Sequence, residues 1–104
     1  MDNLKMIKMQ IENGKQLGSS FSFKQQNKTV WSSVGIQKYD GAYKVYIDEI
    51  DEVNMDAEDY SREETKEFQA LSEALEYIEA TTILTFDRLQ PCKGQRIFNP
   101  KFDN

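Results

Sequence analysis

The clearest pattern of apolar and polar positions lies between residues 29 and 50. Two runs rich in β-branched and aromatic residues, Thr29 to Lys38 and Ala42 to Ile50, flank the sequence Tyr39-Asp40-Gly41. An Asp-Gly pair supplies the positive φ angles that a tight hairpin turn needs. This stretch therefore predicts two antiparallel strands joined by a short turn.

Alternation within the two strands assigns their faces, because successive side chains of a strand point to opposite sides of a sheet. We expect one face to be buried, and it carries Val30, Val34, Ile36, Tyr43, Val45 and Ile47. The opposite face carries Trp31, Lys44 and Tyr46. Trp31 and Tyr46 would form an exposed aromatic pair if the sheet is covered on one side only, and packing under a loop is the alternative.

Three flanking segments predict further β-structure. Leu4 to Ile11 alternates irregularly, and we interpret it as an edge strand rather than a short helix, ended by Asn13-Gly14. Phe21 and Phe23 stand at period two before a polar turn, which indicates a second hairpin with the strand that begins at Thr29. Thr81 to Phe86 is typical of a strand, and we expect Ile97 and Phe98 to tie the following tail to the core.

A helix is predicted from about Arg62 to Glu79. Ser61 and Glu64 have the spacing of a reciprocal N-terminal cap. Apolar residues then recur at steps of three and four, while acids occupy the outer face. The stripe is Phe68, Leu71, Leu75 and Ile78, and the outer acids are Glu63, Glu67, Glu73 and Glu76. The expected fold is α+β, with an antiparallel sheet of about four to five strands and one long helix packed on one face.

Composition agrees with one domain spanning residues 1–104. The chain is 38% hydrophobic and 12% aromatic, which is enough to build a core. Cys92 is the one cysteine, so no intramolecular disulfide can form. The N-terminal residues lack the continuous apolar region of a signal peptide, and no stretch approaches membrane-spanning length. We therefore expect a cytoplasmic protein.

Charge is partitioned along the chain. Residues 1–47 carry +4, residues 48–80 carry −11 and residues 81–104 carry +2, for a net charge of −5. The densest part runs from Asp48 to Glu64 and has nine acids beside one Arg. Such a run attracts a basic partner and repels polyanions.

Nothing in the sequence predicts catalysis, a metal or a cofactor. Histidine is absent, which removes the usual partner of a nucleophilic Ser or Cys, and Cys92 alone cannot hold zinc. A carboxylate pair of the glycosidase type would need a cleft that this small fold has little room for. The loop from Asn54 fails as a calcium site, because Asp59 and Thr65 stand where an EF-hand needs Gly and Glu. Lys93-Gly94-Gln95-Arg96 lacks the spacing of a phosphate-binding loop.

The acidic run is instead a candidate binding surface for another protein. The run joins an exposed loop to the first turn of the predicted helix, so we expect its carboxylates to share one side of the molecule. Val53, Met55 and Tyr60 lie among them as apolar anchors. A solvated run without a partner is the simpler interpretation. The candidate partner-binding residues are Asp48, Glu49, Asp51, Glu52, Met55, Asp56, Glu58, Asp59, Tyr60, Glu63, Glu64 and Glu67.

In size, acidity and lack of catalytic residues, the chain resembles the small bacterial immunity proteins of polymorphic and contact-dependent growth inhibition toxin systems. The segments TILTFDRL and KGQRIFNP are similar to strands and tails of such domains. The resemblance covers general character across the whole chain and includes no specific motif. It implies a non-catalytic inhibitor that covers the cationic surface of a basic toxin, such as a nuclease.

Two other functions remain open at this point. A basic, aromatic sheet face around Lys28, Trp31, Lys44 and Tyr46 could bind single-stranded nucleic acid, although the net charge opposes this. Alternatively, an exposed edge strand could pair with a second copy of the chain. The leading hypothesis expects a basic protein partner, no direct contact with nucleic acid and no membrane contact.

Overall fold

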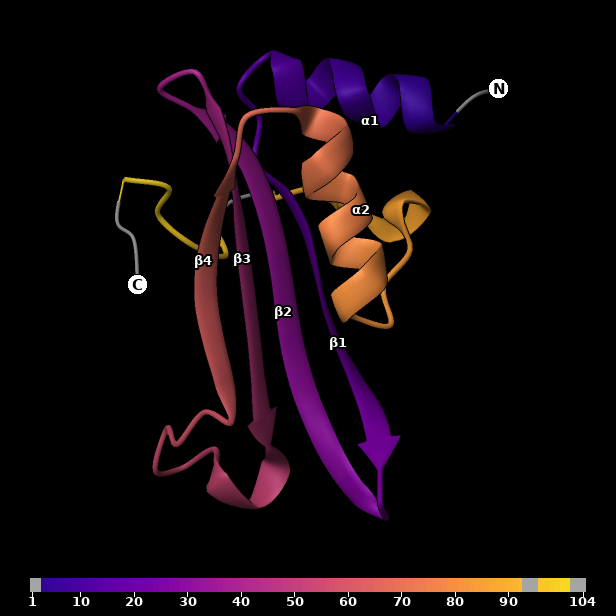
Figure 1. The fold of residues 1–104 in the computed structure, drawn as a ribbon. Coiled ribbons are helices and arrows are strands. Elements are labelled where there is room, and N and C mark those ends of the chain that lie inside the picture. Colours follow the sequence, from indigo (N-terminus) through magenta and orange to yellow (C-terminus); the bar gives the residue numbers. More distant parts are fainter. Residues whose placement is uncertain (1–2, 93–95, 102–104) are drawn as a thin grey trace.

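The fold is a five-stranded antiparallel sheet with two helices (Figure 1), seen in a computed structural model that describes residues 3–92 and 96–101. The strands lie in the order β4-β3-β2-β1-β5. The predicted α+β class and antiparallel sheet are confirmed, and two shorter helices replace the single long one. The elements are α1 (Asn3–Glu12), β1 (Leu17–Gln25), β2 (Lys28–Tyr39), β3 (Ala42–Asp51), η1 (Glu52–Asn54), β4 (Arg62–Phe68), α2 (Leu71–Thr81), η2 (Phe86–Arg88) and β5 (Gln90–Pro91).

Two tight hairpins form the centre of the sheet, as the sequence predicts. Asp40 (φ 54°) and Gly41 (φ 79°) connect β2 to β3, and Gln26 (φ 51°) and Asn27 (φ 66°) connect β1 to β2. Positive φ at both central residues is the type I′ turn, whose twist matches that of the flanking strands. These turns set the register that determines which side chains share a face.

The hydrophobic core lies between one face of the sheet and the two helices. Figure 1 shows α2 lying across the strands and α1 beyond one end of them. Val34, Ile36, Val45 and Ile47 are fully buried, as the alternation predicts. The apolar stripe of α2 packs against them through Leu71, Ala74, Leu75 and Ile78.

The N-terminal segment is a helix, so the predicted edge strand is wrong. Ile7 and Ile11 are buried in the core and lie one helical turn apart. Gly14 (φ 87°) ends the helix: its N–H donates to Ile11 O, and the N–H of Lys15 donates to Gln10 O. This pair of bonds is the Schellman motif, in which a left-handed glycine follows the last helical turn. Asn13-Gly14 was therefore a helix stop and not the end of a strand.

The predicted helix from Arg62 to Glu79 is wrong in its first half, where Arg62–Phe68 forms β4. Ser61 does not cap a helix, since both its N–H and its hydroxyl donate to Glu49 O on β3. Pairing with β3 overrides the helical propensity of this segment, as tertiary contacts often do. The helix begins only at Leu71. Of the four predicted outer acids, Glu63 and Glu67 lie on β4, whereas Glu73 and Glu76 are exposed on α2.

The strand predicted from Thr81 to Phe86 is also wrong. Its backbone groups bond locally: the N–H of Leu84 donates to Thr82 Oγ1 and the N–H of Phe86 donates to Glu79 Oε2. These side-chain acceptors replace a neighbouring strand. The fifth strand is instead the two-residue β5, which pairs with Leu17 and Gly18 of β1.

The second face of the sheet is partly covered by residues 96–101. Phe98 is buried and stacks on Tyr46, with ring centroids 5.6 Å apart. Tyr46 and Lys44 are both buried, so the predicted exposure of this face is wrong around them, and the loop-covered alternative holds there. Trp31 remains exposed. The expected anchoring of the tail is confirmed for Phe98.

Gln16 holds this tail in place. Its buried side chain accepts hydrogen bonds from the N–H groups of Ile97 (2.8 Å) and Phe98 (3.3 Å) and donates to Phe98 O (2.8 Å). Gly18 and Gly35 allow the tail to approach closely, because a Cβ at Gly35 would lie 2.8 Å from the Phe98 ring. The tail is therefore a second, small layer on the sheet.

Candidate functional site

The twelve candidate residues lie on β3, β4 and the connection between them. Five acids are on the paired parts of the strands: Asp48, Glu49, Glu63, Glu64 and Glu67. The other seven lie within residues 51–60, which we call the acidic loop: Asp51, Glu52, Met55, Asp56, Glu58, Asp59 and Tyr60. In Figure 1 this loop is at the end of the molecule opposite α1. The two groups differ in their electrostatic environment.

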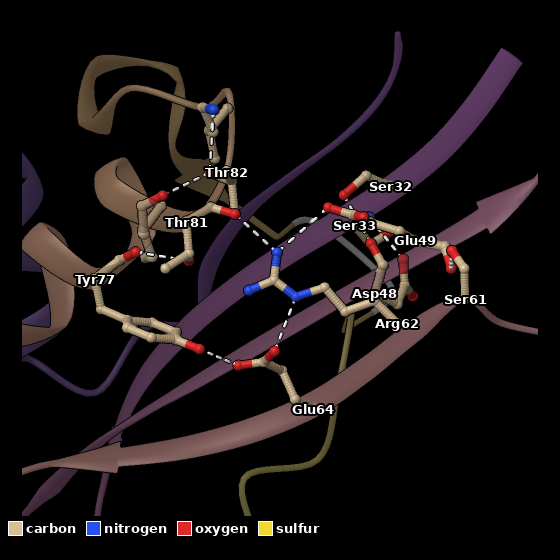
Figure 2. Close-up of polar contacts among 12 residues, drawn as sticks. Ser32, Ser33, Asp48, Glu49, Ser61, Arg62, Glu64, Tyr77, Thr81 and Thr82 are labelled. Atoms are coloured by element: carbon tan, nitrogen blue, oxygen red, sulfur yellow. Dashed lines mark hydrogen bonds and ion pairs between the residues drawn. The ribbon is translucent and has the colours of Figure 1, made fainter. Parts of the chain in front are cut away.

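Arg62 forms ion pairs with two of the strand acids on the α2 side of the sheet. Figure 2 shows its guanidinium between β4 and the end of α2. Its Nε lies 2.8 Å from Glu64 Oε1, and its Nη1 lies 3.3 Å from Glu49 Oε2 and 2.8 Å from Thr81 O. Tyr77 also donates to Glu64. Burial alone would raise the pKa of Glu64, but the bonds from Arg62 and Tyr77 outweigh it and lower that pKa.

Tyr46 contacts two further acids on the opposite side of the sheet. Its hydroxyl lies 3.0 Å from Asp48 Oδ2 and 2.9 Å from Glu63 Oε2. Asp48 Oδ1 also accepts a 2.7 Å bond from the N–H of Ser33. Burial raises the pKa of Asp48, and the charges of Glu63 and Glu49 add to the increase, against the lowering effect of these hydrogen bonds. This pair is held within the fold by one phenol.

Glu67 is paired as well, since its Oε1 lies 2.8 Å from Nζ of the buried Lys44. All five strand acids are therefore bonded to other groups of the same chain. Arg62 and Lys44 offset part of the negative charge of these five acids, whereas Tyr46 is neutral and offsets none. The strand acids are thus part of a structural network and keep a reduced net negative charge.

The acidic loop differs, because its five carboxylates have no ion pair within residues 3–92 and 96–101. Glu52, Asp56, Glu58 and Asp59 are exposed, and Asp51 is partly buried. Three apolar side chains stand out among them: Val53 is 84% exposed, Met55 42% and Tyr60 41%. The loop thus combines unpaired negative charge with apolar surface.

Hydrogen bonds within the loop define its shape. The N–H of Met55 donates to Glu52 O, that of Glu58 to Met55 O, and that of Asp59 to Asn54 O. Glu58 has a φ of 52°, in the left-handed region that non-glycine residues seldom adopt. These bonds fold residues 52–59 into consecutive turns.

The neighbouring β1–β2 hairpin supplies some positive charge. A hollow of about 290 Å³ is lined by Lys24 and Lys28 on one side and by Asp51, Glu52 and Val53 on the other. These lysines offset the potential of the nearest acids. The net negative charge is therefore greatest at the tip, at Asp56, Glu58 and Asp59.

Other candidate sites gain little support. Lys93 to Gln95 of the possible phosphate loop lie outside the described residues. The Cys92 thiol is partly buried, which raises its pKa. In the part of the chain that the structure describes, no three His, Cys, Asp or Glu side chains are grouped to hold a metal ion. No helix there is both long and apolar enough to cross a membrane.

Sequence reasoning missed the roles of Arg62, Tyr46 and Gln16. Arg62 carried a signal, as the single cation within the run from Asp48 to Glu64. Tyr46 and Gln16 carried none, because their partners depend on strand register and on contacts distant in sequence.

Comparison of the chain with protein-family models, with curated proteins and with solved structures finds no match.

Proposed function

We propose that this protein is a non-catalytic binding module whose acidic loop covers a cationic surface of another protein. The observation that carries the proposal is the combination, in residues 51–60, of carboxylates that have no ion pair with any described residue and the exposed side chains of Val53, Met55 and Tyr60. The function that suits this surface best is an immunity protein that neutralises a basic toxin of the nuclease type. Such a partner is expected in the cytoplasm.

The two components of the loop have separate roles. Carboxylates at Asp56, Glu58 and Asp59 accelerate the encounter with a basic protein and orient it. Apolar side chains then contribute affinity that salt does not screen, provided that they enter pockets of the partner. A nuclease needs Lys and Arg to bind phosphate, so an anionic loop at its site excludes the nucleic acid.

The alternative of a nucleic-acid-binding sheet face is weaker. Lys44 and Tyr46 are buried, and Lys44 is already paired with Glu67. Stacking of bases needs an accessible ring, and Phe98 occupies the face of Tyr46. Of the proposed set, only Lys28 and Trp31 are exposed.

The test compares two double variants that remove the same charge. D56N/E58Q changes the tip of the loop, and E73Q/E76Q changes exposed carboxylates on α2; each takes the net charge from −5 to −3. Wild type, loop variant and helix variant are used to capture basic proteins from the native cell. We expect wild type and the helix variant to retain one basic protein and the loop variant to lose it.

The captured protein is then assayed for nuclease activity with increasing amounts of the purified chain. Inhibition should be complete at a one-to-one ratio, and a large excess of D56N/E58Q should be needed for the same effect. Equal loss of binding in both double variants would show that only net charge matters and would contradict a loop site. Turnover of a small metabolite by the chain would contradict the non-catalytic function.

A further inference from the structure

The outer edge of β1 is open along most of its length. β5 pairs only with Leu17 and Gly18, which leaves Ser19 to Gln25 without a neighbouring strand on that side among the described residues. In a two-residue hairpin the residues that flank the turn, here Gln25 and Lys28, exchange hydrogen bonds, and this alternates along the strand. The backbone N–H and C=O groups of Ser20, Ser22 and Lys24 therefore point outward.

Charged side chains protect the other edge of the sheet, at β4, against pairing with a strand of another molecule. The same alternation from the Asp40-Gly41 turn leaves Glu63, Thr65 and Glu67 pointing outward there. A two-fold axis at Thr65 would place Glu63 of one copy opposite Glu67 of the other, and like charges directly opposite are unfavourable. Charged edge positions of this kind prevent pairing between molecules.

The β1 edge has the opposite character. Its open positions carry two serines and one lysine, and Phe21 and Phe23 stand between them on the face toward α2. Both rings are partly buried and line a hollow of about 340 Å³ together with Ile83, which is 63% exposed, and the other walls of this hollow include Glu49 and Arg62. An added strand would lie beside the two rings.

We propose that β1 pairs with β1 of a second copy around a two-fold axis at Ser22, so that the two sheets become continuous. In this register Phe21 of each copy lies opposite Phe23 of the other, an arrangement that favours aromatic cross-strand contacts. Each Lys24 lies opposite Ser20. The two lysines are then about 14 Å apart, four strand positions at about 3.4 Å each, which exceeds the Debye length of about 8 Å at physiological salt.

The register also leaves the pairing between β1 and β5 intact. Shifting the axis toward Gly18 would require its outward groups, which β5 already occupies through Gln90. The pairing is isologous and closes as a dimer. A second copy is therefore the occupant that matches the edge in backbone polarity, apolar surface and charge.

Sedimentation velocity over a concentration series tests the association. We expect a monomer–dimer equilibrium for wild type and a several-fold weaker one for S22K, in which two added cations face each other at the axis and high salt restores pairing. T65K is the matched control on the β4 edge and should dimerise as wild type does. A wild type that stays monomeric overturns the proposal, and so do open-ended assemblies or equal weakening in S22K and T65K.

Mild oxidation tests the register. Cα atoms of a hydrogen-bonded antiparallel pair are about 5.5 Å apart, within the range of a disulfide, so S22C should give a covalent dimer. K24C should give none, because its two thiols would be separated by four strand positions. Wild type under the same oxidation measures any contribution of Cys92. Equal cross-linking of S22C and K24C would overturn the two-fold at Ser22.

Discussion

Replacing Asp48 by Asn should stabilise the fold, because Asp48 and Glu63 now share a single hydrogen-bond donor, the hydroxyl of Tyr46. Tyr46 has one hydroxyl hydrogen and lies about equally close to Asp48 (3.0 Å) and Glu63 (2.9 Å). An amide at position 48 resolves this conflict. Its oxygen can accept the N–H of Ser33, and its nitrogen can donate to the Tyr46 oxygen, whose hydrogen then goes to Glu63.

The gain is about 1 kcal/mol of unfolding free energy. One added hydrogen bond contributes about 1 kcal/mol net. Loss of the repulsion between Asp48 and Glu63 adds a smaller amount, since solvent screens this partly buried pair. The bond from Ser33 weakens when its acceptor loses the charge, which offsets part of that amount. For a domain of this size, about 1 kcal/mol corresponds to a rise in Tm of about 5 °C.

The stabilisation should depend on pH in a defined direction. The pKa of Asp48 is raised in the folded state, chiefly by burial, so folding favours its protonated form. In wild type, the ionised Asp48 therefore lowers the free energy of unfolding at pH values above its folded-state pKa. This destabilisation disappears as the pH falls through that value. The advantage of D48N should be full at neutral pH and should shrink in acid.

Urea denaturation of wild type and D48N at neutral and mildly acidic pH measures both effects. D51N is a matched control, because it removes the same charge at the end of β3, where the Asp51 carboxylate makes no hydrogen bond or ion pair with the described residues. A less stable D48N at neutral pH would refute the reasoning. So would an increase of the same size at both pH values.

Three further substitutions test the packing of the sheet by chemical denaturation. Gly35→Ala should lower the free energy of unfolding by about 1 to 3 kcal/mol, because the new Cβ would lie 2.8 Å from the Phe98 ring and displace the tail. Faster proteolysis after Arg96 would report that displacement. Gly41→Ala should cost about 1 to 2 kcal/mol through backbone strain alone, since φ is 79° and no atom lies within 4 Å of the new Cβ. Gln16→Leu should cost about 2 to 3 kcal/mol, because the N–H of Ile97 and the carbonyl of Phe98 lose their partner; an unchanged midpoint would contradict its role in holding the tail.

The two central hairpins could be predicted because their signals are local. Asp40-Gly41 and the period-two residues around it specify turn and register without help from distant contacts. The segment from Arg62 to Phe68 could not, because its spacing is compatible with a helix until it meets β3. Likewise, Leu4 to Ile11 was ambiguous without the surface that Ile7 and Ile11 cover.

The candidate site was predictable only as a region. The charge count identified the stretch of chain that carries the acids, with Val53, Met55 and Tyr60 beside them. It was wrong about their placement, because Glu63 and Glu64 lie on opposite faces of β4 instead of together at the start of a helix. Which carboxylates are paired depends on strand register, which brings Arg62 opposite Glu49 and Glu63 opposite Asp48. That information became available only with the three-dimensional arrangement.

The bond between Gln16 and Phe98 joins residues 82 positions apart. Closing so long a segment of chain has a larger entropic cost than closing the two hairpins, whose turns span two residues each. The hairpins should consequently form early, and the tail should dock late, after the transition state. Until the tail docks, the ring of Tyr46 is uncovered, so this face of the sheet is more exposed to aggregation during folding than in the native state.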